Sequence, residues 1–470
     1  MKNKEQIKYR IGLKRFLNSL KRKKKKKELR KKEHENYIRA KAELKNDLSY
    51  QNQIDKWLPS NLTYILGNEK ANFISNLNNS KVYNSTFNIK VPKIFSLIEY
   101  EKESYDFIRK LTIAILFDKY KSIEIDYIDC ERIELSAQIY CDMILRDLDK
   151  FIKRRNQNRH TQSNIAHLSG ININDENIQK LLFSVGSPAI ITKDFRKYSD
   201  ITPYKLCVHN KEDNKLENAK RKEIDSTEMV EYVIKSLATL DKKLTSDSIE
   251  DLSVVIGEIL INAEEHSTTK YRYSTGYFQK QTIDGEDFGV FNLAIMNFGE
   301  TIYEKFKSPE CTNYDMKSRM SSLSSKYTKK SLWSKSFDEE TLWTLYSLQQ
   351  GITSVSIDSY KRGNGSIQFI ESFFNLKGTN ENADDISRMA IISGNTNIIF
   401  DGKYNIQNKI KGKDEFKVMT FNNSNNIEDK PDNKYVKSVE NYFPGTIIFF
   451  PFVSLNSKPL KILFFSSNQF

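Results

Sequence analysis

The sequence predicts a mixed α/β protein in which a basic N-terminal arm precedes two globular units. The chain has 470 residues, of which 38% are hydrophobic, enough for two or three domains with cores of their own. Segments with apolar residues at every second position alternate with segments in which apolar residues recur every three or four positions. No run of about 18 apolar residues is present, so we expect no transmembrane segment.

The net charge of the chain, +13, is concentrated at its beginning. Residues 1–35 hold 16 Lys and Arg against 4 Glu, a balance of +12, so the rest of the chain is close to neutral. The block KRKKKKKELRKK repels itself and cannot bury a core, which predicts a solvated helical or disordered arm over residues 1–48. Such an arm can bind the phosphates of nucleic acid or of acidic lipid, or it can serve only to keep the chain in solution.

Residues 91–200 are predicted to form a first α/β domain, after a weakly patterned linker at 49–90. Within this domain, SIEIDYID at 122–129 shows the alternation of a strand. In 136–152 and 174–186, the apolar residues recur at helical spacing.

The second domain is predicted to extend from residue 201 to residue 470. We expect strands at 204–210 and 443–452, a strand with a turn behind it at 289–302 and a hairpin at 387–406. Helices are expected at 225–240 and 246–267, and a glycine-rich turn that opens a helix at 360–376. Asp225 and Glu228 have the spacing of a capping box, which favours a helix that begins at Asp225. The segments 303–350 and 407–440 are polar and weakly periodic, and we expect them to be loops.

The helix expected at 246–267 carries three polar residues on one face. Glu258, Asn262 and His266 follow one another at intervals of four, beside an apolar stripe. A buried carboxylate needs a partner or a water molecule. Asn262 can ligate a hydrated Mg²⁺ through its amide oxygen, while Glu258 orients or deprotonates a nucleophile. Alternatively, the three residues only line the edge of a solvated face.

Two further motifs follow this helix. A buried strand ends at Asn297 and is followed closely by Gly299, and Gly363 and Gly365 precede a helix. Glycines at such a turn let backbone N–H groups approach a phosphate, and the N-terminus of a helix favours an anion. Each motif alone is also typical of an ordinary turn, but their order and spacing after the polar helix indicate a nucleotide site.

With these motifs, residues 200–455 resemble the GHKL (Bergerat-fold) ATP-binding domain of histidine kinases, gyrase, the mismatch-repair ATPases and anti-sigma serine kinases. The resemblance implies an α+β two-layer sandwich. It also implies that EILINAEEH is the N box, with Glu258 as the general base and Asn262 as the Mg²⁺ ligand. The glutamate and the closing His266 are most similar to the anti-sigma kinase type. NFGET would be the G1 box, with Asn297 at the adenine and Gly299 after it.

The resemblance also assigns the phosphate-binding turn and the lid. GNGSI would be the G2 box, with Gly363 and Gly365 near the phosphates, and residues 303–360 would be the ATP lid. Thr446, in the last strand, would face the nucleotide pocket. The lid segment holds lysines that can reach phosphate or can simply be solvated: Lys326, Lys329 and Lys330.

The G1 box departs from the family. The usual motif is Asp-x-Gly-x-Gly, whose aspartate accepts a hydrogen bond from the adenine amino group, whereas this chain has Asn297 and, in place of the second glycine, Thr301. An asparagine carbonyl still accepts that bond, but more weakly than a charged group. Two functions therefore stay open. One is Mg²⁺-dependent ATP hydrolysis or phosphoryl transfer that acts as a regulatory switch. The other is a degenerate, non-catalytic module docked on nucleic acid by the arm at 1–48.

In the first domain, SIEIDYIDCERIELSAQIYCDMIL resembles the strand–turn–helix of STAS domains. The resemblance would place Ser136 where those domains carry a phosphorylatable serine, although Glu-Leu-Ser-Ala here differs from their Asp-Ser-Ser-Gly. Alternatively, the segment is an ordinary strand and amphipathic helix, with Ser136 as an N-cap.

The cysteines and the resemblance together give expectations about location and partners. Four scattered cysteines without CxxC spacing favour a reducing, cytoplasmic location. Domains of the GHKL class often act as dimers, so the expected partners are ATP, a protein partner or a second copy of the chain, and nucleic acid through the arm.

Overall fold

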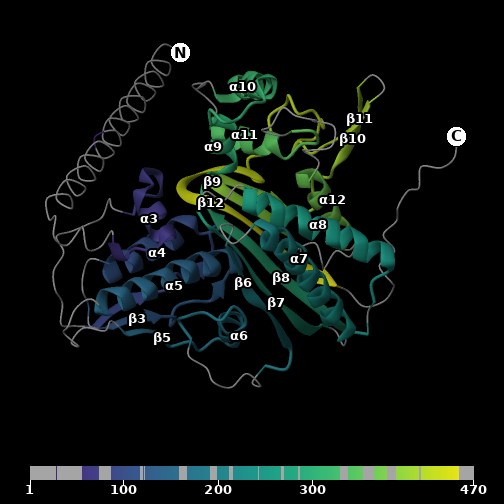
Figure 1. Cartoon of the computed structure of the whole chain (residues 1–470). Coiled ribbons are helices and arrows are strands. Elements are labelled where there is room, and N and C mark those ends of the chain that lie inside the picture. The colour runs from purple at the N-terminus through teal and green to yellow at the C-terminus, as the bar shows by residue number, and fades with distance from the viewer. Residues whose placement is uncertain are drawn as a thin grey trace, which may run out of the picture.

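The computed structural model of the chain is a mixture of helices and sheets (Figure 1). It describes residue 28 and residues 56–73, 86–116, 120, 122–157, 167–190, 198–210, 215–241, 243–265, 269–283, 286–328, 337–352, 365–377, 388–411 and 414–454. All but one residue of the predicted basic arm, 1–48, lies outside these ranges. None of the helices within them is long and apolar enough to cross a membrane.

The first unit is built on a parallel sheet in the order β1-β3-β5. The chain passes from one strand to the next through a helix, as parallel neighbours require. The strands and helices are β1 (Thr86–Lys90), α4 (Glu101–Leu116), β3 (Ser122–Asp126), α5 (Leu135–Gln157), β5 (His167–Ile171) and α6 (Glu176–Ser184). Two short parallel strands, β2 (Ile94–Phe95) and β4 (Arg132–Ile133), lie beside them. The strand and both helices predicted here are therefore present.

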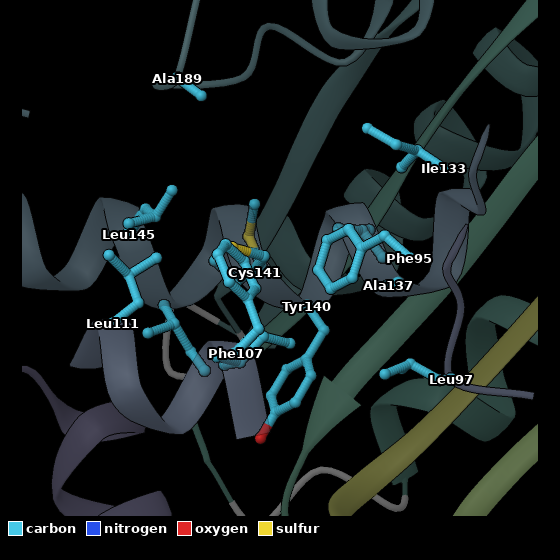
Figure 2. Packing of buried hydrophobic residues seen from close by; sticks show 14 of the residues in the cluster. Phe95, Leu97, Phe107, Leu111, Ile133, Ala137, Tyr140, Cys141, Leu145 and Ala189 are labelled. Atoms are coloured by element: carbon cyan, nitrogen blue, oxygen red, sulfur yellow. The ribbon is translucent and has the colours of Figure 1, made fainter. Parts of the chain in front are cut away.

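The core of this unit forms because α4 and α5 each turn an apolar stripe toward the other (Figure 2). Tyr140 of α5 is fully buried, and its ring lies 5.9 Å from the ring of Tyr105 on α4. Phe107 meets Phe95 edge to face, with ring centroids 5.3 Å apart. The same hydrophobic cluster continues into the second unit, where Tyr140 contacts the ring of Phe443 at 5.0 Å.

Part of the range predicted to be a linker, 49–90, is packed instead. It contains α3 (Ser60–Gly67) and the short 3₁₀ helix η1 (Glu69–Ala71). Leu62 and Ile65 of α3 are fully buried, and α3 contacts α5. Asn, Ser and Lys residues interrupt the apolar ones over 49–90, so the pattern is weak, but the buried side chains of α3 and η1 belong to the hydrophobic cluster of the first unit.

The second unit contains a five-stranded antiparallel sheet in the order β6-β7-β8-β12-β9. Its strands are β6 (Ile201–Asn210), β7 (Tyr271–Ile283), β8 (Glu286–Phe298), β9 (Met389–Phe400) and β12 (Val436–Ser454). The hairpin predicted at 387–406 is instead the single strand β9. Gly394 lies inside it with φ +57°, where the pairing of β9 with β12 shifts register, so the Ser-Gly-Asn sequence makes an irregularity within a strand and not a reversal.

Helices cover both faces of this sheet (Figure 1). One face packs against α7 (Lys215–Ala238), α8 (Ser246–Glu265) and α12 (Gly365–Lys377). The other face packs against α4, α5 and η1 of the first unit. Consecutive residues of β12 serve the two cores, since Ile447 belongs to one hydrophobic cluster and Ile448 to the other. The sheet therefore lies between two helical layers, whereas the resemblance implied a two-layer sandwich.

The segment 303–350, predicted to be a loop, is largely helical. It forms α9 (Ile302–Lys307), α10 (Tyr314–Thr328) and α11 (Glu339–Ser347), and Trp343 of α11 is buried. Numerous Ser and Lys residues separate the apolar residues of this segment and obscure the helical period; α11 packs on β9. The polar segment 407–440 likewise contains a hairpin of β10 (Gln407–Lys411) and β11 (Asp414–Val418).

Candidate functional site

A row of polar residues crosses the five-stranded sheet in register. Each member lies opposite the next one on the neighbouring strand, so all five side chains point to the same face. This is the face covered by α7, α8 and α12, because Arg272 reaches Asp225 of α7 and Thr446 neighbours Ile448 of that core. From β6 to β9 the row consists of His209, Arg272, Asn297, Thr446 and Ser393.

Asn297 lies at the centre of the row and is completely buried. Within the described part of the chain, neither its Oδ1 nor its Nδ2 has a hydrogen-bond partner. An unsatisfied buried polar group typically costs about 1–3 kcal/mol, so an amide with both ends unpaired is an unusual element of a sheet core. Such a side chain is suited to a ligand that brings its own donor and acceptor.

On one side of Asn297, two hydroxyl groups are paired with each other. Thr446 Oγ1 and Ser393 Oγ are 3.0 Å apart, and Ser393 Oγ accepts a hydrogen bond from the backbone N–H of Ile302 at 3.0 Å. Thr446, the residue expected in the nucleotide pocket, therefore lies directly beside Asn297 and is linked through Ser393 to the first residue of α9.

On the other side of Asn297, a buried ion pair ties the sheet to α7. Arg272 Nη2 donates to Asp225 Oδ2 at 2.7 Å, and both side chains are nearly inaccessible. His209 joins the group, since its ring nitrogens lie 3.9 Å from Asp225 and 3.6 Å from Glu264 of α8. The predicted capping box at Asp225 and Glu228 is wrong, because α7 begins at Lys215 and Asp225 lies inside the helix, facing Arg272.

Glu258 and Asn262 lie one turn apart on α8, as predicted. Both are half-buried, whereas Ile259 and Ala263 beside them are buried. The helix packs on β7 and β8, the strands that carry Arg272 and Asn297. The structure thus places the predicted polar stripe on the helix that covers the polar row.

Other predicted residues are only partly placed. His266 and Gly363 lie outside the described residues, and Gly365 is the first residue of α12, as expected for a turn that opens a helix. Gly299 has φ +147° and donates its N–H to the carbonyl of Pro444, so its role here is to let the chain leave β8 while still paired with β12.

Gly445 explains why β12 can approach Asn297 so closely. A Cβ atom at Gly445 would lie 2.0 Å from the backbone oxygen of Asn297, and the residue has φ +150°. No other residue type fits this position without displacing β8.

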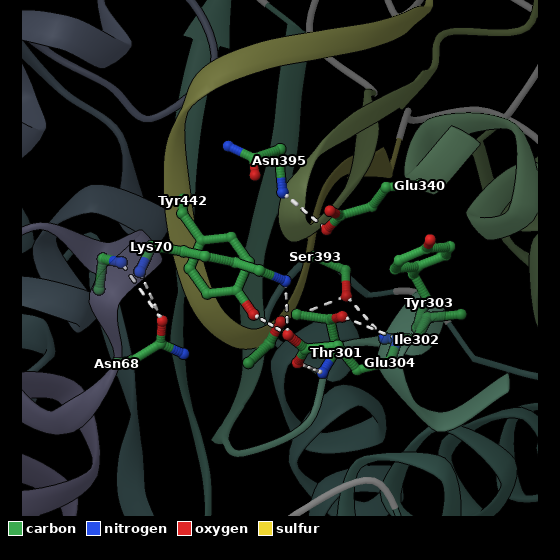
Figure 3. A network of polar contacts seen from close by, with 12 residues as sticks. Asn68, Lys70, Thr301, Ile302, Tyr303, Glu304, Glu340, Ser393, Asn395 and Tyr442 are labelled. Carbon is green, nitrogen blue, oxygen red and sulfur yellow. Dashed lines mark hydrogen bonds and ion pairs between the residues drawn. The ribbon is translucent and has the colours of Figure 1, made fainter. Parts of the chain in front are cut away.

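Thr301, at the position where the resemblance implied a second glycine, begins α9 with a capping box (Figure 3). Its hydroxyl accepts from the Glu304 N–H, and the Glu304 carboxylate accepts from the Thr301 N–H, each at 3.1 Å. The same carboxylate accepts from Lys70 of η1 and from the Tyr442 hydroxyl, both at 2.8 Å. The cap therefore also joins α9 to the first unit.

The charge state of Glu304 follows from these contacts. Burial by itself raises the pKa of its carboxyl, but the hydrogen bonds from Lys70, Thr301 and Tyr442 outweigh burial and hold the pKa below its usual value. The stabilisation is therefore present above the ordinary carboxyl pKa and is lost as the pH falls through the lower folded-state pKa.

Replacement of Thr301 by alanine is expected to lower the free energy of unfolding by about 1–2 kcal/mol, because an N-cap hydroxyl is lost at a buried position. Urea denaturation measures the change. Ser325→Ala is the matched control, since its hydroxyl is exposed on α10 and bonds only one carbonyl of its own helix; a change within about 0.5 kcal/mol is expected there. Equal losses in the free energy of unfolding of the two variants would show that the Thr301 cap does not stabilise the fold.

Two residues singled out in the sequence have ordinary structural surroundings. Lys326 forms a surface ion pair with Glu428 at 2.8 Å, which agrees with the solvated alternative; Lys329 and Lys330 lie outside the described residues. Ser136, the candidate phosphoacceptor, is fully buried and donates to the carboxylate of Glu134.

The site also contains residues that the sequence did not single out. Arg272 and Ser393 complete the row on either side of Asn297 and Thr446. Arg272 lies in strand β7, which was not predicted. The sequence feature that could have indicated this residue is a single arginine between two tyrosines. Ser393 lies in the segment interpreted as a hairpin. No three His, Cys, Asp or Glu side chains gather into a metal-binding group within the ranges that the structure describes.

No protein-family model matches the chain, and no curated protein and no solved structure is measurably similar to it.

Proposed function

We propose that the protein binds ATP with Mg²⁺ in the manner of the GHKL class and hydrolyses it or transfers its γ-phosphate. The observation that carries the proposal is the completely buried amide of Asn297, which has no partner among the described residues and lies between Arg272 and Thr446. An asparagine amide can accept a hydrogen bond from the adenine amino group and donate one to a ring nitrogen.

The helix that covers this row supplies the remaining chemistry. Asn262 would hold Mg²⁺ through its amide oxygen. One protein oxygen is enough, because this ion usually takes one or two protein oxygens together with phosphates and waters. When bound, Mg²⁺ neutralises charge on the phosphates. Glu258, one turn earlier on α8, would take the proton from the attacking water or hydroxyl.

The contacts around the row support a role as a conformational switch. Thr446 contacts Ser393, Ser393 accepts from the first N–H of α9, and Glu304 of α9 binds Lys70 of the first unit. If a bound nucleotide displaces Thr446, the displacement would therefore change the contacts through Ser393 and α9 that reach the first unit. The backbone of α9 joins these hydrogen bonds, and proof of coupling needs a measured effect of nucleotide on the first unit.

The test is calorimetric titration of the full chain with ATP, in Mg²⁺ and in EDTA. We expect a Kd below about 1 mM that depends on Mg²⁺. Asn262→Ala is expected to weaken binding in Mg²⁺ by roughly 10- to 100-fold. Asn408→Ala, an exposed asparagine on β10, is the control and should bind as the wild type does.

The outcomes separate the two functions left open by the sequence. Absence of binding near 1 mM, about the weakest affinity the proposal allows, contradicts nucleotide recognition. Binding without any turnover supports the non-catalytic alternative, in which the fold serves as an interaction module.

A further inference from the structure

The amide of Asn297 has no fixed orientation. Among the described residues, nothing donates to its Oδ1 and nothing accepts from its Nδ2. Its two neighbours in the row are engaged with other partners, because Thr446 pairs with Ser393 and Arg272 reaches Asp225. Rotation of the amide about the Cβ–Cγ bond exchanges donor and acceptor without breaking a hydrogen bond to a described residue.

A carboxylate at this position would behave differently. An ionised aspartate only accepts hydrogen bonds, so it selects a ligand edge that donates. The asparagine amide carries an acceptor and a donor side by side and can present them in either order.

The two purine bases differ in the order of these groups. Adenine carries an amino donor at position 6 beside an acceptor nitrogen at position 1. Guanine carries an oxo acceptor at position 6 beside an N–H at position 1. Both edges are donor–acceptor pairs of the same spacing, and a free amide satisfies either one with two hydrogen bonds by choosing its orientation.

Further hydrogen-bond donors lie beside Asn297 and can donate to the oxo group of guanine. Arg272, opposite Asn297 on β7, has its Nε and Nη1 without partners among the described residues. The third nitrogen of the same guanidinium donates to Asp225 Oδ2 on α7. A base that presents an acceptor can therefore accept from the two remaining nitrogens of Arg272.

We infer that the site accepts adenine and guanine nucleoside triphosphates with comparable affinity. The inference rests on the proposed function, because it requires that the base lies against Asn297. It deepens that function by naming the substrate class as purine nucleoside triphosphates and by making Asn297 the residue that relaxes base specificity.

The experiment is calorimetric titration of the full chain with ATP and, separately, with GTP, both with Mg²⁺. The wild type is expected to bind the two within about tenfold of each other. A site that leaves a polar group unpaired discriminates far more strongly, so Asn297→Asp is expected to favour ATP over GTP by at least about 100-fold. Asn292→Asp is the matched control, since Asn292 lies on the same strand but points to the opposite face, where it lines a cavity beside Glu134. Its ATP-to-GTP ratio should equal that of the wild type.

Each outcome decides one question. Wild-type affinity for ATP more than about 100-fold above that for GTP overturns the inference and leaves the proposed function standing. Binding of neither nucleotide contradicts the proposed function itself. If Asn297→Asp does not fold, the wild-type ratio still decides, because it requires no variant.

Discussion

Replacement of Glu258 by glutamine is expected to abolish nucleotide turnover and to leave nucleotide binding intact. A general base contributes roughly 10²- to 10⁴-fold to a rate, and glutamine has nearly the same shape but cannot take the proton. The half-buried position on α8 should therefore be preserved. Turnover of ATP measured as phosphate release, together with calorimetric binding, separates the two effects.

The matched control is Glu250→Gln, two turns earlier on the same helix, where the side chain is exposed. Wild-type turnover is expected in that variant. Unchanged turnover in Glu258→Gln would show that this carboxylate is not the base. Loss of both binding and turnover would show that Glu258 maintains the structure of the binding site and is not the base that takes the proton.

Replacement of Arg272 by methionine is expected to lower the free energy of unfolding by about 3–5 kcal/mol, because it leaves the Asp225 carboxylate buried without its closest partner, with the exposed Arg221 still at 3.4 Å. The double variant Arg272→Met, Asp225→Leu should recover most of the loss. Replacing a buried ion pair by apolar side chains of similar size is often neutral, whereas removing one partner is not.

Urea denaturation followed by tryptophan fluorescence measures both effects. Lys235→Met is the control, since the Lys235–Glu231 pair is exposed on the same helix α7 and its loss should cost less than about 1 kcal/mol. Two results would contradict strong coupling between Arg272 and Asp225. One is an Arg272→Met variant as stable as the wild type, and the other is a double variant no more stable than Arg272→Met.

The helix α8 was predictable because its own sequence determines it. Apolar residues such as Ile256 and Ile259 keep the helical period over five turns, and the buried end of β8 before Asn297 is a continuous apolar run. Both elements are confirmed by the structure. What the sequence could not supply is the register of the sheet, which alone brings Asn297 beside Thr446 and Arg272.

The strands β7 and β9 were missed or misinterpreted because their pairing partners determine them. The segment around Arg272 mixes Tyr, Ser, Thr and Gly without clear alternation, and it is extended because β6 and β8 supply hydrogen bonds on both sides. In β9, Ser-Gly-Asn has the composition of a turn, yet Gly394 is accommodated by a register shift opposite β12. The spacing of Asp225 and Glu228 is that of a cap, but tertiary contact with Arg272 holds Asp225 inside α7.

The structure shows what surrounds Thr301 and Asn297, the two residues that differ from the motif expected from the resemblance. Thr301 is an N-cap whose cap also binds the first unit through Glu304 and Lys70, a role that glycine cannot perform. Asn297 is a neutral amide beside Arg272, which already forms a buried ion pair with Asp225, and an amide adds no further charge to bury there.

The most direct test of the central claim is an experimental structure of the full chain with Mg²⁺ and a non-hydrolysable ATP analogue. We predict the base edge within hydrogen-bond distance of Asn297, next to Thr446, and the metal at the amide oxygen of Asn262. An analogue bound anywhere else, with Asn297 still unpartnered in the core, would contradict this claim.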